Sequence, residues 1–164
     1  MYFTTFVAFA AAALIANTVA AQSSIFNVNH TVHLGSPDGT RLRYTPLFVH
    51  AEVGDSIDFT FLAKNHSATQ SQSFYAPCTN KVNGTDSGFM PNAVNQTTNL
   101  PVFHYIVNST DTVYFHCRQD EGTDSAHCGQ GMVFVLNPSF DGEATLFQLK
   151  AQEFGANVLG VPQT

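Results

Sequence analysis

The stretch Tyr114–Pro138, YFHCRQDEGTDSAHCGQGMVFVLNP, begins and ends in strand-like residues and concentrates sulfur and imidazole groups between them. It holds two of the three cysteines, two of the seven histidines and one of the three methionines of the 164-residue chain. Alternate side chains of a strand share a face. We therefore expect Val113, Phe115 and Cys117 to face a core, and we interpret His116, on the opposite face, as a solvated or packing histidine.

The order of donor groups in this stretch is typical of a mononuclear metal site. Cys117 precedes a turn-rich loop, His127 follows that loop, and Met132 begins the next strand-like run. A blue copper site needs one thiolate, two imidazoles and a weak axial thioether. The second imidazole must come from elsewhere in the chain, and His66, at the end of the strand-like run SIDFTFLAK, is the best candidate. The pattern predicts one copper ion.

The surrounding sequence predicts an all-β fold. Turn residues separate short runs rich in Val, Phe, Tyr and Ile. These runs are VNHTVHL, LFVHAEV, SIDFTFLA, VFHYIVN, TVYFHC and GMVFVLN. Many short strands with turns between them favour a β-sandwich or a small barrel. We expect residues 67–74 to form a short helix or loop, and the polar, Asn-rich residues 81–100 to form a long surface loop.

One helix is expected near the end of the chain, over about residues 141–155. Leu146, Leu149 and Phe154 are its predicted apolar positions, and Gly155 is expected after its last turn. The sequence therefore predicts a sandwich followed by a short C-terminal helix.

Residues 1–21 are typical of a secretory signal peptide. They carry no charged side chain and end in the small residues Val19-Ala20-Ala21, which indicates cleavage before Gln22. The alternative, a membrane anchor, is disfavoured because the apolar run is short. The final residues, NVLGVPQT, do not read as a lipid-anchor signal. We expect a soluble, secreted, extracellular protein in which residues 22–164 form one domain, with a core over about 26–138.

The amino-acid composition limits the kinds of binding partner that we expect for this protein. The formal charge is −6 and 11% of residues are charged, which argues against nucleic-acid binding. We also expect no membrane partner and a monomer. Sequons for N-glycosylation begin at Asn29, Asn65, Asn83, Asn95 and Asn108. A glycan on Asn65 would crowd the predicted ligand next to it, so the other four asparagines are the candidates.

The run VGDSIDFTFLAKNHSATQSQSFYAPC, followed by FHC and AHCGQGMVFVLNP, resembles the cupredoxin domain of fungal secreted phytocyanin-like proteins. The resemblance implies a Greek-key β-sandwich with one type 1 copper ion. It implies four copper ligands: His66, Cys117, His127 and Met132. It also implies a disulfide between Cys78 and Cys128, which leaves Cys117 unpaired. The nine residues 118–126 make a longer insert than plant phytocyanins have.

Simpler interpretations remain for single residues. Cys117 is alternatively a buried structural thiol, or a disulfide partner of Cys78 or Cys128. Met132 is alternatively a core residue only, because the run MVFVL is apolar in any case. Four other histidines are expected to have no metal role: His30, His33, His50 and His104.

Three classes of function are compatible with this sequence. The first is single-electron transfer by a copper protein, which we favour because four protein ligands leave no obvious open position. The second is an extracellular or cell-surface binding module in which copper is incidental or absent. The third, a copper-dependent oxidative enzyme, is disfavoured because the chain has no His-x-His pair. The insert 118–126 is acidic and lies near His127, so we expect a basic redox partner there.

Overall fold

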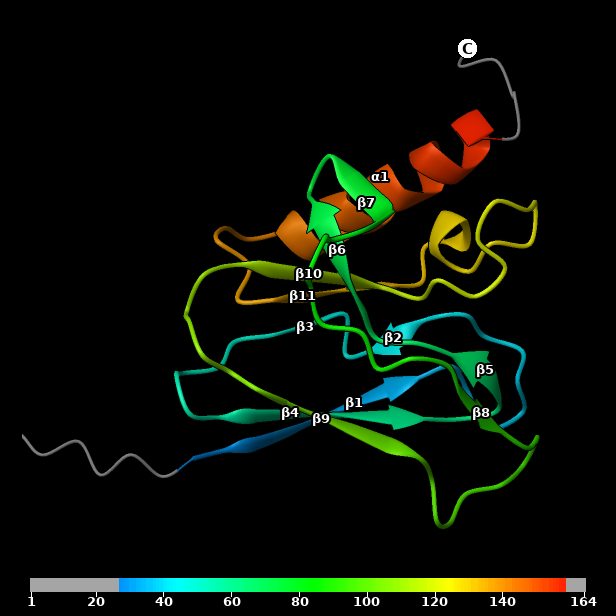
Figure 1. The fold of residues 1–164 in the computed structure, drawn as a ribbon, viewed down its shortest axis with the longest axis horizontal. Helices are drawn as coiled ribbons and strands as arrows, with labels where there is room; N and C mark the ends of the chain where they lie inside the picture. Colours follow the sequence, from blue (N-terminus) through cyan, green and yellow to red (C-terminus); the bar gives the residue numbers. More distant parts are fainter. Residues whose placement is uncertain (1–26, 159–164) are drawn as a thin grey trace, which may run out of the picture.

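The computed structural model describes residues 27–158 as two β-sheets packed face to face, with a helix laid across one of them (Figure 1). The predicted signal peptide lies outside the described residues. Between residues 27 and 158, no helix combines the length and the apolar character needed to cross a membrane.

The first sheet has the strand order β2-β1-β4-β9. Its strands are β1 (Asn29–Leu34), β2 (Tyr44–Thr45), β4 (Ser56–Phe61) and β9 (Val102–Ile106). β1 runs parallel to β4, and the other neighbours are antiparallel. A separate two-stranded sheet pairs β5 (Lys64–His66) with β8 (Met90–Asn92).

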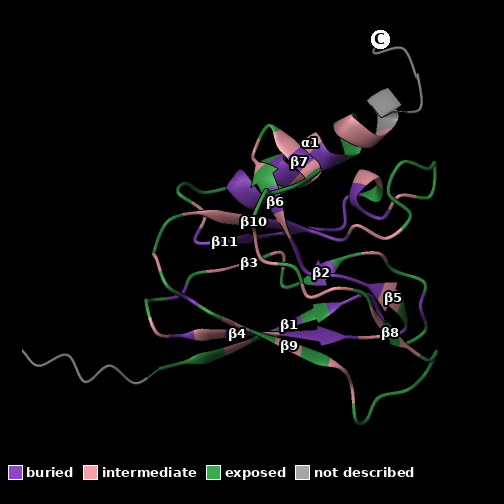
Figure 2. Cartoon of the chain, in the orientation of Figure 1, coloured by how far each residue is buried: buried purple, intermediate pink, exposed green. Residues whose placement is uncertain are grey.

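The second sheet has the order β3-β11-β10-β6-β7. Its strands are β3 (Phe48–Val49), β6 (Thr69–Ser73), β7 (Ala76–Asn80), β10 (Val113–His116) and β11 (Val133–Leu136). The short 3₁₀ helix η1 (Cys128–Gln130) precedes β11, and the helix α1 (Glu143–Val158) follows it. All four residues of β11 are buried (Figure 2), because the core covers one face of this strand and α1 packs on the other side of the sheet.

Aromatic rings from both sheets form the core. Phe59 of β4 lies 5.2 Å from Phe115 of β10 and 5.5 Å from Phe134 of β11, measured between ring centroids. All three rings are fully buried, and rings at these separations attract one another beyond their area burial. Cys117 belongs to the same buried cluster as Phe115, as strand alternation predicts. The predicted all-β sandwich with a C-terminal helix is confirmed.

The apolar face of α1 differs from the prediction. Leu146 and Leu149 are 48% and 55% exposed, whereas Ala144, Phe147 and Ala151 are buried. The spacing of three and four residues between these buried positions places them on one side of the helix. The prediction was wrong at the two leucines, which point outward because a phenylalanine between two alanines reaches the sheet; the third predicted position, Phe154, is half-buried.

The end of α1 also differs from the prediction. Gly155 lies inside the helix and contacts Gly129 of η1: a Cβ atom added to Gly155 would lie 2.5 Å from the Gly129 Cα atom. This glycine therefore allows the backbones of α1 and η1 to touch, and it does not end the helix.

Two predicted loops contain strands. Residues 67–74 include β6, whose sequence TQSQS pairs with β10 and β7, so the helix-or-loop prediction was wrong. Residues 81–100 are mostly irregular, but they include β8, which places Met90 opposite His66. Both strands are polar or very short, so neither shows the apolar alternation that marks a strand in sequence.

Candidate metal centre

Three elements bring two histidines and one cysteine together. His66 ends β5, Cys117 directly follows β10, and His127 directly precedes η1. The Sγ atom of Cys117 lies 3.4 Å from Nδ1 of His127 and 3.8 Å from Nδ1 of His66, and the two Nδ1 atoms are 3.2 Å apart. Ligands held about 2.0 to 2.3 Å from a shared ion lie at roughly these separations from one another. The geometry therefore fits one metal ion.

The orientation of the His66 ring is set by the backbone. Its Nε2 atom lies 2.9 Å from the carbonyl oxygen of Ala63. A carbonyl only accepts, so Nε2 carries the proton and the Nδ1 lone pair faces the cluster. Gly35 lies directly behind the ring: a Cβ atom there would be 2.5 Å from Nε2. Sequence reasoning missed both contacts, because neither residue carries a ligand group.

The environment keeps both imidazoles neutral, as a metal requires. Burial lowers the pKa of His66 to about 4, with a smaller contribution from the neighbouring His127 ring. Burial likewise lowers the pKa of His127. Neutral rings leave their Nδ1 lone pairs available as ligands.

Cys117 is a protected thiol. The Cys117 side chain is fully buried, and this burial raises the pKa of the thiol to about 11. The backbone N–H groups of Gln119 and Ser67 oppose that increase, and the Ser67 nitrogen lies 3.4 Å from Sγ. These N–H groups point at the sulfur and would stabilise a thiolate. Cys117 would lose its proton on binding a metal ion here, and the resulting thiolate would have hydrogen-bond donors already in place.

The backbone of Met132 links His127 to Cys117 by hydrogen bonds. Its N–H donates to the His127 carbonyl at 3.0 Å, and its carbonyl accepts from the Cys117 N–H at 3.1 Å. Its side chain is fully buried in the same cluster as Cys117. The proposed role of its thioether as axial ligand stays a prediction.

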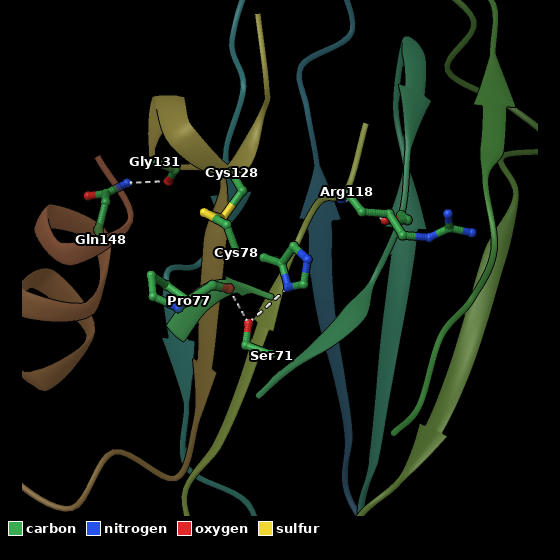
Figure 3. The surroundings of a disulfide bond; sticks show 9 residues. Ser71, Pro77, Cys78, Arg118, Cys128, Gly131 and Gln148 are labelled. Atoms are coloured by element: carbon green, nitrogen blue, oxygen red, sulfur yellow. Dashed lines mark hydrogen bonds between the residues drawn. A yellow bond between two sulfur atoms is a disulfide. The ribbon is translucent and has the colours of Figure 1, made fainter. Parts of the chain in front are cut away.

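The structure contains the disulfide that the resemblance implies. Cys78 in β7 and Cys128 in η1 are bonded, with Cα atoms 5.6 Å apart (Figure 3). Among the described residues, Cys117 is the free cysteine. The bond anchors the residue directly after His127 to the edge of the second sheet, which limits how far that imidazole can move.

The remaining histidines lie outside the cluster. His30 contacts the Asp55 carboxylate and His104 contacts the Asp58 carboxylate. His33 and His50 are exposed. His116 is fully buried, so its solvated interpretation was wrong and it is a packing histidine.

Asn65, next to His66, already makes a side-chain hydrogen bond. Its Nδ2 atom donates to Oε1 of Gln119 at 2.7 Å, and Asn65 is only half-exposed. A glycan on that nitrogen would displace the contact. The other sequon asparagines are exposed, and their glycosylation stays a prediction: Asn29, Asn83, Asn95 and Asn108.

The insert between Cys117 and His127 forms an acidic rim. Asp120, Glu121 and Asp124 are exposed. Asp120 is close enough to oppose, by its charge, part of the pKa decrease of His127. Negative charge is thus concentrated beside one edge of the candidate site.

The sandwich and the buried His-Cys-His set define a cupredoxin, and this chain is one. A thiolate with two imidazoles is the equatorial set of type 1 copper, so the donors present fit one copper ion.

Among curated proteins, the chain is 30% identical over 112 residues to the "Probable GPI-anchored cupredoxin-1" of Arthroderma benhamiae. The match covers 68% of this chain and 53% of that protein, so the chain spans about half the length of this relative. No family model matches the sequence.

Solved structures with a similar arrangement are also cupredoxins. Native pseudoazurin from Hyphomicrobium denitrificans has a TM-score of 0.47 and 20% identity, over 83% of this chain and all of that one. Oxidised plastocyanin from Dryopteris crassirhizoma has a TM-score of 0.46 and 19% identity, over 65% of this chain and 96% of that one. Likeness at this level assigns no function.

Proposed function

We propose that this protein is an extracellular or cell-surface blue copper protein that transfers single electrons. One observation carries the proposal: the Cys117 sulfur and the Nδ1 atoms of His66 and His127 lie within 4.8 Å of one another and are buried. When bound, copper supplies a one-electron Cu(II)/Cu(I) couple. The extracellular location is supported by the predicted signal peptide and by the GPI-anchored description of the curated relative.

The protein's own groups limit rearrangement around the metal. The Ala63 carbonyl holds the His66 ring, and the Cys78–Cys128 bond holds the segment next to His127. Ligands held in this way would keep similar positions in both oxidation states, so we expect little reorganisation to accompany electron transfer. His127 is only 6% exposed, which restricts the approach of a substrate to the metal and favours transfer over bond-making.

The colour of the copper protein tests this function. The wild-type protein with one equivalent of Cu(II) is expected to show an intense visible thiolate-to-copper band, and Cys117→Ser is expected to abolish it. His50→Ala, which changes an exposed histidine outside the cluster, is the control and should keep the band. A colourless wild-type protein after Cu(II) addition would contradict the assignment and favour a binding module without type 1 copper.

The proposed redox partner is basic and approaches at the acidic rim formed by Asp120, Glu121 and Asp124. Opposite charges accelerate encounter, and salt screens them over about 8 Å at physiological ionic strength. We expect the rate of reduction of the Cu(II) protein by a small cationic reductant to fall as salt rises, and the rate with an anionic reductant to rise.

Replacing the three rim carboxylates by amides should flatten both salt dependences. The exposed lysine–glutamate pair of α1 provides the matched surface control through Glu153→Gln. Unchanged salt dependence in the rim variant would show that the partner does not approach there.

A further inference from the structure

Residues 85–88, in the long segment after β7, run along β6 beside the candidate metal centre. Asp86 forms an antiparallel bridge with Thr69. One residue further on, the Ser87 N–H donates to the Ala68 carbonyl at 3.1 Å. These backbone contacts fix where the Asp86 carboxylate lies relative to the first residues of β6.

A directed chain of hydrogen bonds joins this carboxylate to Ser67. Oδ1 of Asp86 lies 2.8 Å from Oγ1 of Thr69, and that hydroxyl lies 2.9 Å from Oγ of Ser67. A carboxylate only accepts, so Thr69 donates to it and accepts in turn from the Ser67 hydroxyl. Both hydroxyl residues are buried, where such bonds strengthen one another. The carboxylate therefore sets the direction of both hydroxyl groups.

Ser67 directs its other polar groups at the segment that carries the cysteine. Because its hydroxyl proton is committed to Thr69, its oxygen accepts from the Arg118 N–H, at 3.0 Å. Its own N–H points at the Cys117 sulfur, at 3.4 Å. The buried Tyr44 hydroxyl donates to the Ser67 carbonyl at 2.7 Å. With all these groups engaged, the Ser67 N–H keeps its direction toward the sulfur.

Arg118 closes the chain into a ring of contacts. Its side chain extends away from the disulfide in Figure 3, and its guanidinium pairs with Oδ2 of Asp86 at 3.2 Å. The guanidinium also lies over the Phe89 ring. The ion pair is partly exposed, so its charge alone adds little stability. Its effect is geometric, because both ends of the ring meet in the residue directly after Cys117.

We propose that Asp86 is a positioning residue of the metal centre, which fixes through Thr69 the direction of the Ser67 N–H toward the Cys117 sulfur. Hydrogen bonding around the cysteine sulfur tunes the reduction potential of a blue copper site. This consequence rests on the proposed electron-transfer function, whereas the positioning itself requires no copper.

Amide hydrogen exchange in the metal-free, disulfide-intact, full-length protein tests the positioning. Thr69→Val keeps the shape of the side chain but breaks the chain of hydrogen bonds. It should accelerate exchange of the Ser67 and Arg118 amides about tenfold relative to the Val135 amide. The Val135 N–H donates to the Leu47 carbonyl and reports the stability of the second sheet. Unchanged relative exchange at Ser67 would overturn the proposal.

Asp86→Asn keeps an acceptor but removes its charge, and it decides by itself if Thr69→Val does not fold. Charge-assisted hydrogen bonds are roughly twice as strong as neutral ones, so this variant should accelerate the relative exchange of Ser67 about threefold. In the Thr69→Val background it should add no further change. Additive effects would show that Asp86 does not act through Thr69. Thr112→Val, which removes a hydroxyl that donates to the Asn137 carbonyl, is the control and should leave Ser67 unchanged.

The reduction potential of the copper-loaded protein tests the consequence for the metal. Thr69→Val changes no charge, and a weaker N–H contact makes the sulfur a stronger donor to Cu(II). We expect the ratio of Cu(I) to Cu(II) at a fixed potential to fall about threefold, which equals a decrease of about 28 mV. Thr112→Val should keep the wild-type potential. An unchanged potential beside accelerated Ser67 exchange would overturn the effect on copper. A colourless wild-type protein would contradict the proposed function alone, because the exchange rates would still decide the positioning.

Discussion

Gly35 controls the candidate metal centre without supplying a ligand. Its φ of +87° lies in the left-handed region, and its missing side chain leaves the space that Nε2 of His66 occupies. The ring is thereby held between the Gly35 backbone and the Ala63 carbonyl. The sequence revealed the ligand types by their chemistry, but it could not reveal this support, because a contact between Gly35 and His66 exists only after β1 and β5 are folded.

Gly35→Ala is therefore expected to harm both stability and metal binding. A positive φ alone costs an alanine about 1 kcal/mol, and the collision with His66 adds to this, so we expect a loss of about 2–4 kcal/mol in the free energy of unfolding. Cobalt affinity, measured by the thiolate–Co(II) band, should fall at least about tenfold.

Gly88→Ala is the matched control, because Gly88 has a φ of +68° and no atom within 4 Å of the added Cβ position. It should lose about 1 kcal/mol and keep its cobalt affinity. If the two variants lose equal stability and bind cobalt equally, the proposed support of His66 by Gly35 is wrong.

At the level of elements, apolar alternation was the reliable signal. β10 and β11 were predictable because Phe115, Phe134 and their neighbours alternate or run continuously in apolar residues, as half-buried and buried strands do. β6 was not predictable, because its residues TQSQS are polar and it is held by pairing with β10 and β7. The position of α1 was predictable, but its face was set by packing against the sheet.

The contact between α1 and η1 predicts that a Gly→Ala substitution inside α1 lowers the free energy of unfolding, which is opposite to its usual effect in a helix. Gly→Ala inside a helix normally stabilises by about 1 kcal/mol. Gly155→Ala should instead destabilise, because the new methyl group would meet the Gly129 backbone at 2.5 Å. We expect a loss of about 1–3 kcal/mol by urea unfolding with the disulfide intact.

Gln152→Ala, at an exposed position of the same helix, is the control and should change the free energy of unfolding by less than about 0.5 kcal/mol. A stabilised Gly155→Ala variant would mean that α1 does not rest on η1 through these two glycines.

At the scale of the whole molecule, the site depends on the complete sandwich. His66 and His127 are 61 residues apart in the chain, yet their Nδ1 atoms are 3.2 Å apart. Their approach requires β5 beside one sheet and the β10–η1 connection beside the other, with the Cys78–Cys128 bond closing a separation of 50 residues. The same burial that gathers these rings also lowers the pKa values of His66, His116 and His127.

This burial predicts how the stability of the metal-free protein depends on pH. The pKa of His66 and that of His116 both fall from 6.5 to about 4 on folding, because desolvation opposes the charged ring. The unfolded chain therefore binds more protons than the folded one between these values, so stability is complete above about pH 6.5 and falls as pH decreases toward 4.

Each shift corresponds to at most about 3 kcal/mol. Among the carboxylates with lowered pKa values, Asp55 acts below about pH 4, and Glu143, whose pKa is lowered from 4.5, adds to the decrease only at the acidic end of this window. Urea unfolding between pH 4 and 8 should show the decrease, and replacing the exposed His33 and His50 by alanine should leave its slope unchanged. A constant free energy of unfolding from pH 7 to pH 4.5 would show that these rings are not buried in the neutral form.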